Sequence, residues 1–211
     1  MIDLAPHLSG FLAAYAILLV GASSPGPSVA MILGIATGQG RGPALVASAG
    51  VASGSIVLNL GTLVGVGLIL SQAAWAMSVL RVIGAAYLLY LAHGAFRRAL
   101  NPPVLRPQEA AGRSALRHFA RGFTLQVTNP KAIAFWLAIA AIGATEGGGP
   151  AVAALFVLGA FLISFLCHGA WAVALSAAPV RAAYAARRRW IEAALGTFFV
   201  FAAWKLATSE N

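Results

Sequence analysis

Residues 23–28 read SSPGPS and lie in the middle of an apolar run that extends from about residue 11 to about residue 36. Such a run is long enough to cross the ~30 Å hydrocarbon core of a bilayer as a helix. A proline inside a helix removes a backbone hydrogen bond, and in lipid the freed carbonyl needs another polar partner. The serine hydroxyls around the prolines can supply such partners. The stretch therefore predicts a broken transmembrane helix with a functional break; the alternative is a tolerated kink.

The whole chain has the composition of a membrane protein. Of its 211 residues, 60% are hydrophobic and 9% are charged, against roughly 25% charged residues in a soluble domain. The first apolar run has no Lys or Arg before it and continues past residue 30, which favours a retained span over a signal peptide. We therefore predict an all-α, multi-pass protein of the cell (inner) membrane. Its six spans cover residues 9–36, 44–70, 76–96, 119–144, 150–176 and 190–207, all approximately.

Basic residues indicate the orientation of these spans. The net charge of +9 comes from arginines grouped in loops rather than on one amphipathic face, so we interpret it as a topology signal and predict no nucleic-acid partner. Lys and Arg accumulate in cytoplasmic loops, and eleven arginines against two basic residues then place both termini outside the cytoplasm. The eleven are Arg41, Arg97, Arg98, Arg106, Arg113, Arg117, Arg121, Arg181, Arg187, Arg188 and Arg189; the two are Arg81 and Lys205.

Two pairs of segments indicate an internal repeat. The first pair is IGAAYLLYLAHGA (83–95) and LGTFFVFAAWKLA (195–207). The second pair is GRGPALVASAG (40–50) and EGGGPAVAALF (146–156), and both members of this pair open a span with Gly-Pro. A chance likeness of apolar sequences is the alternative. A repeat of three spans enters the membrane inverted in its second copy, as in many secondary transporters. The predicted single domain, 1–211, then consists of repeat 1 (about 9–97), a cytoplasmic linker (about 97–118) and repeat 2 (about 119–207).

The same alignment brings a second break into register with the first. Pro27 comes near Pro130 of the TNPK stretch, each in the first span of its half, and paired breaks point to a transport site. Lys131 follows ten residues after Arg121, which puts it roughly 15 Å deep in a helix. An ammonium group there indicates either a functional role or a side chain that snorkels to the interface. Asn129 offers hydrogen-bond donors and an acceptor at the same place.

The second predicted span has two stripes at helical spacing. The polar stripe predicts a pathway lining at Ser55 and Asn59, and the glycine stripe is typical of close helix packing. The polar stripe contains Ser48, Ala52, Ser55 and Asn59, and the glycine stripe contains Gly50, Gly54, Gly61 and Gly65.

Other polar residues give weaker signals. His93 and His168 lie inside predicted spans, where histidines can relay protons or ligate haem, although His93 is close enough to Arg97 to be interfacial. Glu192 lies beside Arg187–Arg189, which predicts an interfacial ion pair. We find no nucleotide-binding loop, metal-ligand spacing or nucleophile motif. The chain is thus predicted not to be an enzyme and to need no cofactor or metal.

Taken together, four stretches resemble the LysE/RhtB-type amino-acid exporters: SPGPS, GQGRGPALVASAGVASG, RVIGAAYLLYLAHGAFR and FARGFTLQVTNPKAIAFW. They occur in that family's order and at about its spacing. The resemblance implies six helices in two inverted triplets, export of amino acids or small derivatives, coupling to the proton gradient, and a homodimer. Matched motif by motif, it implies that the site residues are Pro25, Gly26, Pro27, Asn129, Pro130 and Lys131.

Two positions differ from the family's usual pattern. Ser28 follows PGP where family members commonly have Asn, and Ser55 stands where they commonly have Asp. A serine cannot hold a substrate ammonium by charge or carry a proton near neutral pH. We therefore hypothesise that backbone carbonyls at the PGP break bind the ammonium of an amino acid and that Lys131 or a half-helix N-terminus binds its carboxylate. The expected solute is less cationic than lysine.

The predicted function is thus a secondary transporter in the lipid bilayer that exports a small amino-acid-like substrate by alternating access. The candidate substrate-binding residues are Pro25, Gly26, Pro27, Ser28, Ser55, Asn59, Asn129, Pro130 and Lys131. Three alternatives stay open: a transporter of another solute such as a metal ion, an electron carrier that uses His93 and His168, and a structural subunit without a pathway.

Overall fold

The computed structural model describes residues 4–70, 75–102 and 114–208, and all regular secondary structure in this part of the chain is helical. A short 3₁₀ helix, η1, precedes eight α-helices. Their bounds are η1 Ala5–His7, α1 Leu8–Ser23, α2 Pro27–Gln39, α3 Arg41–Leu70, α4 Trp75–Leu100, α5 Ala115–Val127, α6 Pro130–Ala140, α7 Pro150–Ala174 and α8 Ala178–Ala207.

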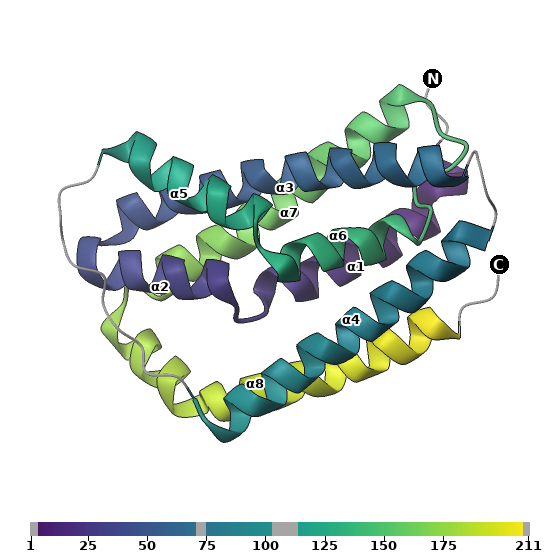
Figure 1. Ribbon diagram of the computed structural model, residues 1–211. Coiled ribbons are helices and arrows are strands. Elements are labelled where there is room, and N and C mark those ends of the chain that lie inside the picture. Colours follow the sequence, from purple (N-terminus) through teal and green to yellow (C-terminus); the bar gives the residue numbers. More distant parts are fainter. Residues whose placement is uncertain (1–3, 71–74, 103–113, 209–211) are drawn as a thin grey trace.

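Two predicted spans are broken at the two motifs singled out in the sequence. The first consists of α1 and α2, which the SPG stretch separates, and the fourth consists of α5 and α6, which Thr128 and Asn129 separate. In both cases the proline occupies the first position of the second half-helix, where its missing N–H costs little. Figure 1 shows each pair of half-helices lying end to end along the bundle, with the two breaks close together at its middle. The predicted helix breaks are confirmed.

Four described helical stretches are long and apolar enough to cross a membrane: Ala5–Ser23, Arg41–Gly65, Pro150–Ala174 and Ala178–Ala207. The loops that join α2 to α3 and α7 to α8 are shorter than the sequence predicts, whereas the loop between α6 and α7 is longer. One residue, Gly40, joins α2 to α3, and its φ of 91° is a conformation that only glycine adopts without strain. The central part of the predicted linker, with Arg106 and Arg113, lies outside the described residues.

The last helix begins much earlier than predicted. It starts at Ala178 instead of near residue 190, so Arg181 and Arg187–Arg189 belong to a helix and not to a loop. Pro179 lies in its first turn, and alanines fill residues 182, 183, 185 and 186. Alanine is the strongest helix former, whereas the arginines on either side of these alanines lower the hydropathy on which the predicted boundary depends. Likewise, Arg97 and Arg98 belong to α4, and Arg117 and Arg121 to α5.

Helix α3 packs closely against α5 through glycine. The carbonyl of Phe119 and the backbone nitrogen of Phe123 pass so close to Gly50 that a methyl group there would lie 2.0 Å from Phe119 O. Gly122 of α5 is equally close to Ala47 O of α3, at 2.1 Å. The predicted packing role is therefore confirmed for Gly50 and Gly54. A methyl group at Gly61 or Gly65 would meet none of the described atoms within 4 Å.

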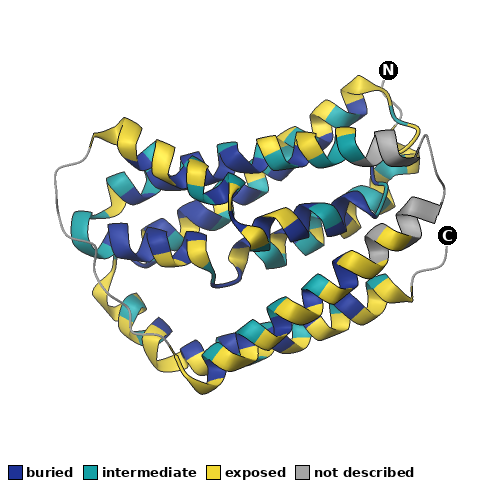
Figure 2. Ribbon diagram, in the orientation of Figure 1, coloured by how far each residue is buried: buried dark blue, intermediate teal, exposed yellow. Residues whose placement is uncertain are grey.

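Helices α4 and α8 form a separate pair along one side of the bundle (Figure 1). Their interface is made of small residues such as Ala92, Ala95 and Ala203, with Phe199 beside them, and Phe135 of α6 packs against it. Figure 2 shows broad exposed faces on both helices outside this narrow buried seam. These faces carry large apolar side chains such as Leu89, Val200 and Phe201, which is what a lipid environment requires.

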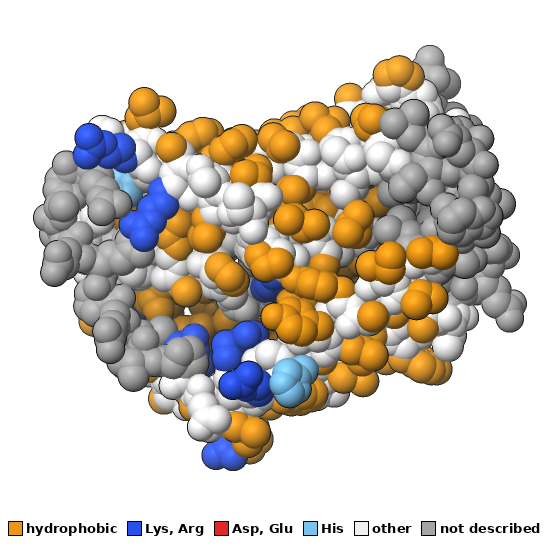
Figure 3. Space-filling view, viewed as in Figure 1, with side chains coloured by type: hydrophobic (Ala, Val, Ile, Leu, Met, Phe, Trp, Pro, Cys, Tyr) orange, Lys and Arg blue, Asp and Glu red, His pale blue; other side chains and the backbone are white. Residues whose placement is uncertain are grey.

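Basic side chains gather at one end of the bundle. On the face in Figure 3, the Lys and Arg side chains lie toward the end where α5 begins and α4 ends, and hydrophobic side chains cover much of the remaining described surface. Under the rule applied to the sequence, an end rich in Lys and Arg is expected on the cytoplasmic side.

Candidate functional site

The break between α1 and α2 leaves carbonyl groups that find new partners. Ser24 caps α1 in an extended conformation, and its hydroxyl donates to the carbonyl of Gly21 at 2.8 Å. The indole Nε1 of Trp171 in α7 donates to the carbonyl of Ser23 at 3.1 Å. The next carbonyls along the chain, those of Ser24 and Pro25, accept from Lys131. Polar groups thus replace the missing helical bonds, as predicted, although they come largely from α6 and α7.

The second break meets the first through Asn129. This residue caps α6, and its Oδ1 accepts from the backbone N–H of Lys131 at 3.1 Å. Its Nδ2 donates to Ser28 Oγ in the first turn of α2, at 3.3 Å. Asn129 and Ser28 are both buried. Residues a hundred positions apart are therefore joined directly at the two helix breaks.

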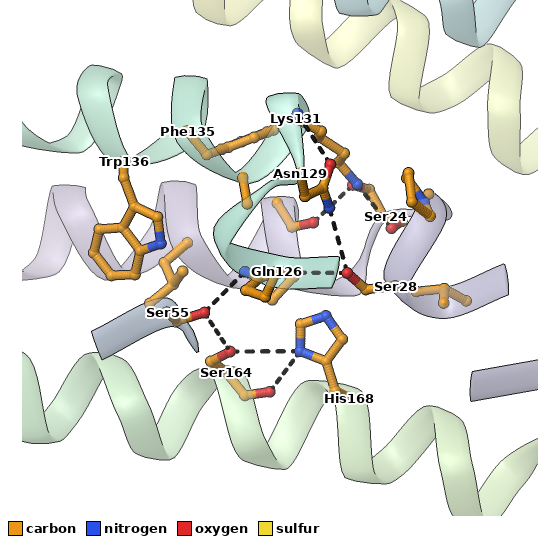
Figure 4. Close-up of a pocket in the computed structure, with 17 residues that line it drawn as sticks. Ser24, Ser28, Ser55, Gln126, Asn129, Lys131, Phe135, Trp136, Ser164 and His168 are labelled. Atoms are coloured by element: carbon orange, nitrogen blue, oxygen red, sulfur yellow. Dashed lines mark hydrogen bonds between the residues drawn. The ribbon is translucent and has the colours of Figure 1, made fainter. Parts of the chain in front are cut away.

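A chain of buried hydrogen bonds extends from Ser28 across four helices (Figure 4). Ser28 Oγ donates to Gln126 Oε1 of α5 at 3.1 Å, and Gln126 Nε2 donates to Ser55 Oγ of α3 at 2.9 Å. Ser55 Oγ lies 3.2 Å from Ser164 Oγ of α7, and one turn later His168 Nδ1 lies 2.8 Å from the Ser164 carbonyl. We call these five residues the polar chain. Together with other residues, the polar chain lines a cavity of about 40 Å³, which is enough room for one or two waters.

Lys131 turns toward the first break and not toward the membrane interface. Its Nζ donates to the Ser24 carbonyl at 2.9 Å and to Ser24 Oγ, and it lies 3.5 Å from the Pro25 carbonyl. The side chain runs over Gly26, where a methyl group would lie 3.1 Å from Nζ and 3.2 Å from Cδ. A side chain at residue 26 would thus crowd Lys131 and require it to shift. In this conformation the ammonium group is bound at the break between α1 and α2.

A larger cavity of about 190 Å³ lies on the other side of Lys131, between the two breaks and the α4–α8 pair. Engineered protein cavities of about 150 Å³ bind molecules the size of benzene, so this one can hold a small amino acid. Tyr87, Tyr90 and Arg98 of α4 line it from one side. Pro25, Gly26, Pro27, Asn129, Pro130 and Lys131 line it from the other.

An ion pair ties α4 to α8 beside this cavity. Glu192 is completely buried, and its Oε2 lies 3.0 Å from Arg98 Nε; its Oε1 lies 3.9 Å from Arg188 Nε. The predicted ion pair exists, but its closest partner is Arg98 of α4 and not the neighbouring arginines. Because α8 starts at Ala178, Glu192 lies midway along that helix. Glu192 therefore lies within a helix that is long and apolar enough to cross a membrane.

The structure brings together all the predicted site residues except one. Pro25, Gly26, Pro27, Ser28, Ser55, Asn129, Pro130 and Lys131 line one or both of the cavities at the breaks. Asn59 is buried on the same stripe as Ser55 but lines a different cavity, with Thr62 and Glu146, toward the start of α7. Ser48 donates to the carbonyls of Ala44 and His168 and so connects α3 to α7.

Sequence reasoning missed Gln126 and Ser164. Gln126 lies three residues before Asn129 in an apolar segment, and a buried amide in a membrane helix is a signal that could have identified it. Ser164 gives almost no signal, because a single serine is easily accommodated in any helix.

The two intramembrane histidines are not partners. His168 is buried in the polar chain, whereas His93 is exposed on α4 and does not line the cavity that contains His168. In the described ranges, no three His, Cys, Asp or Glu side chains come together in the way that ligands of a metal ion do.

Comparisons with known proteins agree on one kind of protein. The family model described as "LysE type translocator" matches residues 19–210. The chain is 25% identical to the threonine efflux protein of Escherichia coli K12 over 193 residues, which are 90% of this chain and 93% of that protein. It is 34% identical to the leucine efflux protein of Klebsiella pneumoniae over 133 residues, which are 62% of this chain and 59% of that one. No solved structure matches the chain.

Proposed function

Because the chain belongs to the LysE type translocator family, we propose that it exports a small neutral amino acid across the cytoplasmic membrane. Relatives that cover most of its length are named for threonine efflux, and another is named for leucine efflux. The observation that carries the proposal to this site is the meeting of two broken helices at a cavity of amino-acid size. Broken helices at the midplane are how secondary transporters bind small polar solutes.

We infer a six-span architecture in two inverted triplets. Counting each broken pair as one span, the first triplet is α1/α2, α3 and α4, and the second is α5/α6, α7 and α8. Three spans in each half reverse the direction of the second half. Each triplet begins with a Pro-broken helix and continues with a helix that has Gly-Pro at its start, which supports the inference. The basic end in Figure 3 favours a cytoplasmic position for that end, with both termini on the other side.

The expected solute is neutral because the described cavity at the breaks is lined by cationic and not acidic side chains. Arg98 and Lys131 contribute the charges of that lining. Ser55 supplies a hydroxyl that already hydrogen-bonds Gln126 and Ser164. Glu192 pairs with Arg98, but no described acidic side chain lines the cavity itself. A solute with a second positive charge would therefore meet Lys131 at close range without a carboxylate in the lining to offset it. The carboxylate of a neutral amino acid is instead attracted to Lys131 and Arg98.

Export by alternating access would expose this cavity to each side of the membrane in turn, driven by the proton gradient. Of the described residues that line the small cavity, Lys131 and His168 are the titratable ones, so we propose that one of them carries the coupling proton. We also propose that the transporter functions as a homodimer.

Counterflow from proteoliposomes tests the function. Labelled threonine, leucine and lysine are offered separately, with and without an imposed pH gradient. We expect threonine or leucine to accumulate at least tenfold faster than lysine, and an inward proton gradient to raise net export. Movement of none of the amino acids would refute the proposal in favour of a structural subunit. Equal rates for lysine would refute the neutral preference, and indifference to the pH gradient would refute proton coupling.

A substitution tests the substrate preference in the same assay. Ser55→Asp adds a carboxylate to the polar chain, and Ser55→Asn is the neutral control of similar size. We expect the Asp variant to raise the rate for lysine relative to that for threonine, and the Asn variant to leave this ratio unchanged. An unchanged ratio in the Asp variant, with the protein folded, would show that Ser55 does not set the charge preference.

A further inference from the structure

The ammonium group of Lys131 occupies a site that its own helix does not favour. Lys131 is the second residue of α6, where the helix dipole presents its positive end and disfavours a cation. The side chain bends away to the carboxyl end of α1, where the dipole is negative and carbonyls are free of helical bonds. The position of this charge is therefore set by the break between α1 and α2.

The number of oxygens around Nζ equals the number of hydrogen-bond donors of a primary ammonium. An ammonium on a carbon chain has three donors and no acceptor. Here it meets three acceptors: the carbonyls of Ser24 and Pro25, and Ser24 Oγ. Two of the three are backbone atoms, so the site survives any substitution of the serine side chain. We call this group of oxygens the oxygen cage.

The oxygen cage lies between the two cavities: Ser24 lines the small cavity, Pro25 lines the larger one, and Lys131 lines both. Arg98 lines the larger cavity from the opposite side. A neutral amino acid in the cavity carries a primary ammonium like that of Lys131 and a carboxylate that pairs with a free lysine or arginine. The cage cannot hold both ammonium groups, because Nζ already uses its oxygens.

We propose that the oxygen cage is a binding site for a primary ammonium and that Lys131 occupies it whenever no substrate is bound. This rests on the proposed function: the ammonium of the exported amino acid displaces Nζ and takes the carbonyls of Ser24 and Pro25. The released Lys131 then pairs with the substrate carboxylate beside Arg98. Since Lys131 is a direct link between α1 and α6, its displacement also removes one of the bonds that join the two broken helices and leaves the bonds of Ser28 to Asn129 and Gln126. Substrate binding is thereby coupled to the relative position of α1 and α6.

Chemical rescue tests the cage without any transport measurement. Lys131→Met keeps the apolar stem over Gly26 and removes the ammonium. We expect its unfolding temperature in detergent to fall by about 5–10 °C and methylammonium chloride to restore at least half of the loss. Tetramethylammonium chloride at the same concentration has the same charge but no N–H donor, so it should restore none. Lys205→Met, which removes the exposed lysine in the last turn of α8, is the matched control and should lose no stability.

A second measurement uses the wild-type protein and is independent of whether the variant folds. The chain has two lysines, Lys131 and Lys205, so ¹⁵N-labelled lysine gives two ammonium signals in NMR spectra. We expect threonine, leucine and methylammonium to shift the Lys131 signal and not that of Lys205. N-acetyl-threonine, which lacks the ammonium, should shift neither.

The inference is overturned if methylammonium neither rescues Lys131→Met nor shifts the wild-type signal of Lys131, or if tetramethylammonium or N-acetyl-threonine act equally well. Its failure is distinguishable from failure of the proposed function. If amino acids undergo counterflow but the NMR signal of Lys131 does not shift, only the ammonium site is refuted. If methylammonium rescues Lys131→Met but no amino acid is transported, the proposed export is refuted and the ammonium site stands.

Discussion

Substitution of Gly122 by alanine tests how far the polar chain depends on the close packing of α3 and α5. A methyl group on Gly122 would lie 2.1 Å from the carbonyl oxygen of Ala47 and 3.0 Å from the backbone nitrogen of Val51, where ordinary contacts begin at 3.4 Å. The obstructing atoms belong to a backbone and cannot rotate away. Helix α5 must therefore move away from α3 by about 1.3 Å.

The size of the effect follows from three contributions. Overpacking of this kind costs about 1–3 kcal/mol, and replacement of a helical glycine by alanine returns up to about 1 kcal/mol through helix propensity. Gln126 lies one turn beyond Gly122 on α5, and its 2.9 Å hydrogen bond to Ser55 lengthens when the helices separate, at a cost of about 1 kcal/mol. We expect a net loss of about 2 kcal/mol, or about 4–8 °C in unfolding temperature, with export reduced because the polar chain is interrupted.

The measurements are thermal unfolding in detergent and threonine or leucine counterflow in liposomes. Gly61→Ala is the matched control: it makes the same chemical change in α3 at a position where the methyl group meets no atom of the described residues within 4 Å. It should be neutral or slightly stabilising and fully active. Wild-type stability and transport in Gly122→Ala, or equal damage from both variants, would refute the link between this helix contact and the site.

Three further predictions concern the polar chain, the ion pair and the stripe on α3. Gln126→Leu leaves Ser28 and Ser55 without their shared partner and should cost about 2 kcal/mol in thermal unfolding and lower counterflow more than Gln126→Glu does. Glu192→Gln leaves two cations facing a neutral amide and should cost about 3–5 kcal/mol, whereas Glu192→Met combined with Arg98→Met should regain part of that loss; a larger loss in the double variant would contradict the pairing. Asn59→Ala removes a buried amide whose Nδ2 has no hydrogen-bond partner among the described residues. Stability and counterflow should therefore stay close to wild type, and a loss of transport would show that Asn59 belongs to the substrate site.

The sequence by itself predicts the features that depend on neighbouring residues. Apolar runs of span length mark the membrane helices, and the prolines at residues 25, 27 and 130 mark the two breaks, because a missing N–H and a fixed φ act within one turn of the helix. The charge of Lys131 stands out for the same reason, since it interrupts a local apolar pattern. The start of α8 was predicted wrongly because arginines lower hydropathy without preventing a helix, as Arg187–Arg189 show.

Only the tertiary structure decides which of these features meet. Gln126 contacts Ser55 across 71 positions of the chain, and Lys131 contacts Ser24 across 107. Asn59 shares a stripe with Ser55, yet one further turn of α3 carries it to another cavity. Helical periodicity fixes the face on which a side chain lies, but the helix that covers that face depends on interhelical packing, such as the contact of Gly122 with Ala47. The sequence therefore determines where the helices break, and the packing of the helices determines that the ammonium of Lys131 fills the gap left by the first break.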